Sequence, residues 1–251
     1  MRRRALTLSW ALAAATVAAQ DTLRFEVASV RPNTGSDQNP SASPHPPDGL
    51  TYVNFPLYQM ILNAYSVRTF QVAGMPGWTM DARYDITARA SGPITSEQRL
   101  LMLRSLLEER FNLKTRLETR EQPVYVLTRA RADEALGPGL KPRPECTAAA
   151  TPCEAAGTGA RAAGYIRGQA FPMSQVQRML SIVLERVVFD ETRIDGVFDV
   201  DVSWRPENAP ADNPLPSLFT AVEERLGLKL TPQRRMVDML VIESLDRATP
   251  Q

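Results

Sequence analysis

A seven-residue segment occurs twice in the chain, and this repeat constrains the fold more than any other feature of the sequence. Residues 108–114 (EERFNLK) match residues 223–229 (EERLGLK) at five of seven positions, 115 positions apart. Two flanking matches keep the same order and nearly the same offset, pairing residues 55–57 with 171–173 and residues 84–86 with 198–200. Matches in one order at a near-constant offset indicate an internal duplication, roughly residues 51–130 and 165–246.

The hydrophobic pattern predicts the same elements near the start of each copy. Apolar residues follow the spacing of one helix face at Leu57, Met60, Ile61, Ala64 and Tyr65, and again at Val176, Met179, Leu180, Val183 and Leu184. Short strands are expected next, at residues 70–73 and 186–189. Two alternating segments then predict strands that bury Tyr84, Ile86, Phe198, Val200 and Val202.

A second helix and a closing pair of strands complete each copy. The helices are expected to begin near Thr95 and near Leu218. The closing strands are expected at residues 113–118 and 124–128 in the first copy, and at 228–230 and 236–243 in the second. This order predicts an α+β fold with two copies of a two-layer strand-helix-strand-strand-helix-strand-strand unit, ferredoxin-like or similar to the amino-terminal modules of secretins. A further strand at residues 25–31 is expected on one sheet edge.

Loop-forming composition divides the chain into five parts. Residues 1–19 are predicted to be a signal peptide, and residues 20–50 a strand followed by a loop rich in Pro, Ser and Asn. The first repeat is expected at 51–136, a linker containing both cysteines at 137–164, and the second repeat at 165–251.

The amino terminus predicts export. Arg2, Arg3 and Arg4 precede an uncharged apolar run at residues 5–19, and small residues before Ala19 are typical of a signal-peptide cleavage site. The alternative, a membrane anchor, is disfavoured because the run is shorter than the ~20 apolar residues that span a bilayer. We therefore expect a periplasmic or secreted protein with no transmembrane segment after cleavage.

The two cysteines fit an oxidising compartment. Cys146 and Cys153 lie in one polar segment, so a local disulfide that closes a short loop is the favoured interpretation. Their number and spacing exclude a C-x-x-C redox pair and a four-ligand metal site.

Composition excludes several classes of function. The chain has 29 Lys+Arg against 28 Asp+Glu, so no basic excess points to nucleic acid. Its single histidine, His45, excludes H-E-x-x-H zinc sites, and its place in a Pro-rich loop makes it a poor catalytic base. Neither of the Gly-rich nucleotide-binding motifs occurs. We expect neither a metal nor a cofactor.

Several segments together carry a family resemblance, namely residues 25–33 (FEVASVRPN), 77–78, 84–86, 102–113, 123–125 and 217–230. They resemble a family of secreted proteins of unknown function that is common in soil bacteria and expanded into many paralogues. The family has Thr-Gly-Leu where this chain has Thr192, Arg193 and Ile194. The family has no established activity. A similar region on some membrane-bound zinc peptidases of the β-lactam-sensor type implies a sensing or binding role.

Two tryptophans are the candidate ligand-binding residues. Trp78 and Trp204 both stand at the ends of elements near prolines, where an aromatic side chain either caps a core or lines a groove. The adjacent Arg234 and Arg235 offer an anion contact between the closing strands, or are solvated in a turn.

Three carboxylates are the candidates for general acid–base chemistry: Asp85, Asp199 and Glu118. Strand alternation favours instead a polar, solvated position for both aspartates. Because no catalytic constellation emerges, the predicted function is an exported, non-enzymatic binding or sensory module for an envelope protein, an extracellular protein or a small ligand. The alternative is a secreted hydrolase that uses a carboxylate pair.

Overall fold

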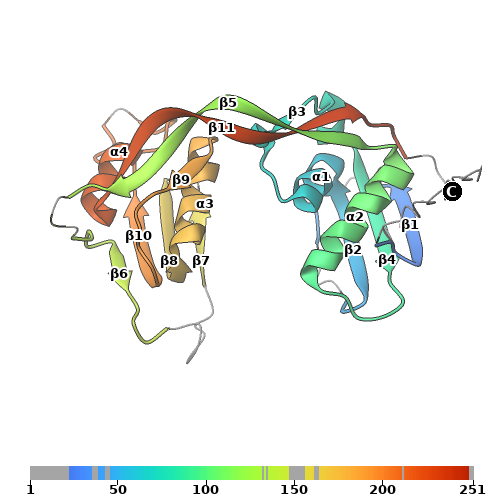
Figure 1. Ribbon diagram of the computed structural model, residues 1–251, viewed down its shortest axis with the longest axis horizontal. Helices are drawn as coiled ribbons and strands as arrows, with labels where there is room; N and C mark the ends of the chain where they lie inside the picture. The colour runs from blue at the N-terminus through green and yellow to red at the C-terminus, as the bar shows by residue number, and fades with distance from the viewer. Residues whose placement is uncertain are drawn as a thin grey trace, which may run out of the picture.

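The computed structural model describes residues 23–35, 39–42, 46–131, 133, 135–146, 156–160, 164–210 and 212–248. These residues form two lobes joined by a long two-stranded ribbon, and both lobes lie on the same side of it (Figure 1). The predicted signal peptide, His45 and Cys153 lie outside the described residues.

The first lobe packs two helices on one face of an antiparallel sheet. The strand order is β1-β4-β2, with bounds Val27–Pro32, Arg83–Arg89 and Gly49–Pro56. Helices α1 (Leu57–Tyr65) and α2 (Ser96–Phe111) cover the apolar face of this sheet. Between α1 and β4 lie 3-10 turns at Thr69–Gln71 and Gly77–Met80 and the short strand β3 (Val72–Ala73).

Local signals explain where α2 begins and ends. The Thr95 hydroxyl accepts a hydrogen bond from the Gln98 N–H at 3.1 Å, and the Gln98 side chain accepts one from the Thr95 N–H at 2.8 Å. This capping box satisfies two N–H groups that have no partner within the helix. The last helical residue is Phe111, and Asn112 after it is left-handed with φ 48°, which ends the helix. The helix start predicted near Thr95 is confirmed.

The second lobe has the same layering with one more strand. Its order is β6-β10-β8-β7, with bounds Leu140–Pro142, Val197–Ser203, Tyr165–Pro172 and Ala156–Ala160. Its helices are α3 (Met173–Leu184) and α4 (Leu218–Ala221), and α4 continues into a π-helical turn at Val222–Leu226. The short strand β9 (Val188–Asp190) follows α3. The segment expected to be a linker therefore contributes two strands to this sheet.

The predicted strand faces are confirmed in both lobes. The buried positions include Tyr84, Ile86, Phe198, Val200 and Val202, none more than 3% exposed. Each alternating strand therefore turns one apolar face to the helices and the opposite face, which carries polar side chains, to solvent. The fold is mixed α and β with several sheets.

The ribbon pairs two strands that come from different halves of the chain. Strand β5 (Lys114–Arg129) runs antiparallel to β11 (Leu228–Ser244) along nearly its whole length. In the first lobe β3 adds to β11 in parallel, with Val72 opposite Leu240. In the second lobe β9 adds to β5 in parallel, with Val188 opposite Tyr125. Strand β11, from the second half of the chain, thus extends into the first lobe. Strand β5, from the first half, extends into the second lobe (Figure 1).

This arrangement corrects the expected closing pairs of strands. Residues 113–118 and 124–128 belong to one continuous strand, and so do residues 228–230 and 236–243. Pro123 and Pro232 both lie within the paired stretch, opposite Arg234 and Tyr125. A two-stranded ribbon directs half of its N–H groups away from the partner strand, where a proline removes no ladder hydrogen bond.

Candidate functional site

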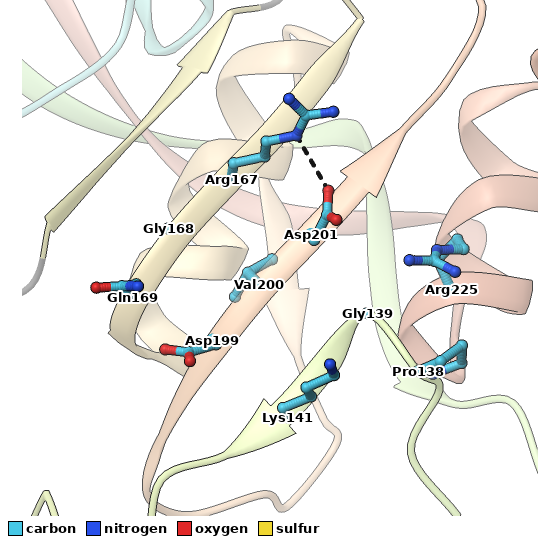
Figure 2. Close-up of a pocket in the computed structure, with 10 residues that line it drawn as sticks. All are labelled: Pro138, Gly139, Lys141, Arg167, Gly168, Gln169, Asp199, Val200, Asp201 and Arg225. Carbon is cyan, nitrogen blue, oxygen red and sulfur yellow. Dashed lines mark hydrogen bonds and ion pairs between the residues drawn. The ribbon is translucent and has the colours of Figure 1, made fainter.

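A polar groove lies on the solvent-facing side of the β6-β10-β8-β7 sheet in the second lobe. It is an open hollow of about 590 Å³ between β6, β8, β10 and the π-helical turn (Figure 2). Six polar side chains line it, namely those of Lys141, Arg167, Gln169, Asp199, Asp201 and Arg225. The alternation of β10 explains the polar floor, because Phe198, Val200 and Val202 point into the core. Its volume lies within the range of small-molecule sites.

Close backbone packing forms one wall of the groove. The Gly139 N–H donates to the Arg225 carbonyl at 2.6 Å, and the Asp201 N–H donates to the Gly139 carbonyl at 2.8 Å. A side chain at Gly139 would collide with the Asp201 carbonyl oxygen. Glycine is therefore required for the segment to pass between β10 and the end of the helix.

The helix that supplies Arg225 ends in an unusual conformation. Residues Val222–Leu226 form a π-helical turn, whereas α2 of the first lobe is α-helical to its last residue, Phe111. Single π-helical turns are rare and frequently occur at functional sites. Here the turn places Arg225 beside the segment that precedes β6.

Each acid in the groove already has an arginine partner. The Arg167 Nε donates to Asp201 Oδ1 at 3.1 Å. The Arg143 Nε donates to Asp199 Oδ1 at 2.9 Å, and this oxygen also accepts the Ala170 N–H at 3.2 Å.

The other two cations have no such partner. Within the described part of the chain, neither Lys141 nor Arg225 has a side-chain ion pair or hydrogen bond. Counting the described residues, the groove therefore holds two acids that are paired with arginine, and two cations, Lys141 and Arg225, that are not paired with an acid.

Asp85 occupies the position of Asp199 in the first lobe and plays the same local role. Its Oδ1 accepts the Asn54 N–H at 2.7 Å and the Asn33 side-chain amide at 2.9 Å. Asn54 and Ala170 are both left-handed bulge residues, with φ 50° and 55°. Each aspartate thus holds a bulge at the end of its neighbouring strand. The two aspartates lie in different lobes and do not form a pair.

The structure places the two candidate tryptophans in separate cores. Trp204 is 4% exposed and packs among the buried residues of the second lobe. Trp78 is half-buried against the first core, and the Arg247 guanidinium lies 4.7 Å from its ring centroid. Neither tryptophan is among the residues that line the groove.

The candidate charged residues on the ribbon are engaged by neighbours. Glu118 accepts a side-chain hydrogen bond from Arg120 and another from Arg116, and these bonds lower its pKa to about 2. A carboxylate held ionised in this way is a poor general acid.

The arginine pair between the predicted closing strands is also occupied. Arg234 pairs with Glu121 at 2.9 Å, and Arg235 pairs with Glu191 at 2.7 Å. Both guanidinium groups therefore contact acids of the protein itself.

The predicted disulfide falls at the edge of the described chain. Cys146 is buried after β6, with its N–H donating to the Arg143 carbonyl at 3.0 Å. Cys153 lies outside the described residues, so the disulfide stays a prediction. Over the described ranges, no cluster of His, Cys, Asp and Glu could hold a metal ion. No helix among those residues has the length and apolar character needed to span a bilayer.

Sequence reasoning missed the groove because its parts come from distant segments. Lys141 falls within the segment expected to be a linker, and Arg225 within the repeated segment, to which no role was assigned. One available signal was the Gly137-Pro138-Gly139 segment, since two glycines around a proline indicate close backbone packing.

The comparisons with known proteins identify a family without an assigned activity. The sequence model of a family described as a protein of unknown function (DUF3738) matches residues 58–245. No curated protein and no solved structure matches the chain.

Proposed function

We propose that this chain, which belongs to the DUF3738 family of proteins of unknown function, is an exported binding or sensory protein whose ligand site is the groove of the second lobe. One observation carries the proposal: a groove of about 590 Å³ contains Lys141 and Arg225, two cations without a partner among the described residues. Both side chains are exposed, so water solvates them in the free protein and an anionic group can reach both. This arrangement supports a role in recognition.

Export rests on the sequence. The basic, apolar and small-residue pattern of residues 1–19 supports secretion, as does the resemblance to secreted proteins of soil bacteria. The ligand is then a molecule of the periplasm or of the surroundings of the cell, and a disulfide between Cys146 and Cys153 suits that compartment.

The two-lobed architecture supports the proposed internal duplication. The order strand, helix, short strand, strand, helix, long strand occurs in β2 to β5 and again in β8 to β11. The contacts between the halves repeat in the same way. Val72 pairs with Leu240, and the equivalent residues of the opposite copies, Val188 and Tyr125, also pair. A duplicated two-layer unit, ferredoxin-like or similar to a secretin module, accounts for these relations.

A hydrolase is the second candidate, and one observation favours it. Asp199 and Asp201 project from one strand into the same groove, as a pair of catalytic carboxylates would. Both are engaged by guanidinium groups, and Asp199 also holds the bulge at Ala170. These contacts favour structural and binding roles over proton transfer.

A library screen distinguishes the two candidates. The purified full chain is tested by thermal unfolding against small anionic, neutral and cationic metabolites, and by turnover of chromogenic esters, glycosides and peptides. A ligand at 100 times its Kd stabilises a protein by about 2.7 kcal/mol. For a chain of this size, that corresponds to a rise in Tm of about 5–10 °C. Binding without turnover is expected. Turnover that Asp201→Asn abolishes would replace the proposal with the hydrolase.

A further inference from the structure

Resting on the proposed function, we infer the class of ligand: a small hydroxylated organic anion, whose carboxylate or phosphate group lies between the Lys141 ammonium and the Arg225 guanidinium. The two cations approach from different elements, Lys141 from β6 and Arg225 from the π-helical turn. Figure 2 shows both side chains directed toward the middle of the groove, on the side of Asp201.

Charge and geometry together select an anion. Lys141 and Arg225 are both exposed, so an oxyanion can reach the space between them and accept charge-assisted hydrogen bonds from both. Arg225 offers a planar fork suited to two oxygens of one anionic group, and Lys141 offers a compact charge. Asp199 and Asp201 do not fill this role, because Arg143 and Arg167 already contact their Oδ1 atoms.

Two hydrogen-bond acceptors in the rest of the groove favour a ligand that also carries hydrogen-bond donors. Asp201 engages Arg167 through Oδ1, which leaves Oδ2 without a partner within the described chain. The amide of Gln169 lies exposed on the neighbouring strand and also lines the groove. Carboxylate and amide oxygens accept from hydroxyl groups. A sugar acid or a sugar phosphate carries both the anion and these hydroxyl groups.

The first lobe provides a matched control. In the second lobe, Lys141 lies opposite Asp199 in the β6–β10 pairing. In the first lobe, Arg31 has the equivalent position, opposite Asp85 in the β1–β4 pairing. Arg110 occupies the place of Arg225 in the repeated segment. Replacing these two arginines removes the same charge from the chain as replacing Lys141 and Arg225, without changing the groove.

Calorimetric titration at constant ionic strength tests the inference on the full chain. The probes are glucuronate, glucose 6-phosphate and neutral glucose. The proteins are the unmodified chain, the double variant Lys141→Gln/Arg225→Gln and the control Arg31→Gln/Arg110→Gln, each checked for an unchanged circular dichroism spectrum. We expect at least one of the anions to bind and glucose to bind at least tenfold more weakly. The double variant should lose at least tenfold in affinity, and the control less than twofold.

Three results would overturn this inference: neither anion binds, glucose binds as tightly as the anions, or the double variant binds like the unmodified chain. Its failure is distinguishable from failure of the proposed function. If neutral or cationic members of the library bind in the groove, the binding function stands and the anionic class is wrong. If no member of any class binds, both are wrong.

Discussion

The effect of Asp199→Ala on the free energy of unfolding tests whether the Asp199 carboxylate has a structural role. The Asp199 carboxylate accepts the Ala170 N–H at 3.2 Å, and Ala170 is only 3% exposed. Without this acceptor the N–H is left unsatisfied, which costs about 1–3 kcal/mol. The half-exposed pair with Arg143 adds less than about 1 kcal/mol. We therefore expect Asp199→Ala to lower the free energy of unfolding by about 2 kcal/mol.

The neighbouring aspartate on the same strand face is the control. Among the described residues Asp201 pairs with Arg167 alone, and both side chains are largely exposed, so Asp201→Ala should cost less than about 0.5 kcal/mol. Urea unfolding measures both values. Thermal unfolding should show a Tm decrease of about 4–8 °C for Asp199→Ala alone. Asp199→Asn keeps a carbonyl acceptor and should recover about half of the loss. Equal costs for the two alanine variants would refute the role assigned to Asp199.

Three further predictions follow from single residues. Arg193 is left-handed with φ 55°, so Arg193→Gly should stabilise the protein by about 1 kcal/mol in urea unfolding; a decrease would show that its side chain matters more than its backbone. Glu118 should titrate with a pKa of about 2 by carboxyl NMR and closer to its ordinary value in Arg120→Gln. Because its folded pKa is lowered, its contribution to stability is present above about pH 4.5 and is lost as the pH falls toward 2; an unchanged pKa in the variant would contradict this cause. Cys146 and Cys153 of the exported chain should resist alkylation until a reductant is added, and immediate labelling of both would exclude the disulfide.

Features that depend on local sequence were predictable. The start of α2 follows from the reciprocal contacts of Thr95 and Gln98, which lie three residues apart. The buried face of β10 follows from strict alternation through Phe198 and Val200. In both cases the determining residues are neighbours in the chain, so spacing alone carries the information.

Features that depend on distant segments were not. The joining of residues 114–129 into one strand depends on β11, a partner more than a hundred positions away in the sequence. The groove likewise depends on the packing of Gly139 against the carbonyl of Arg225. Hydrophobic periodicity reports which face of an element is buried, and it does not report which elements meet.

The most direct test of the binding site is an amide NMR titration of the isotope-labelled full chain with glucuronate or glucose 6-phosphate. If the groove is the site, the signals of Lys141, Gln169 and Arg225 shift with one common dissociation constant. Signals of Thr51 and Thr87, on the equivalent face of the first lobe, should stay in place. Shifts confined to the first lobe or the ribbon, or no shifts at all, would contradict a binding site in the second lobe.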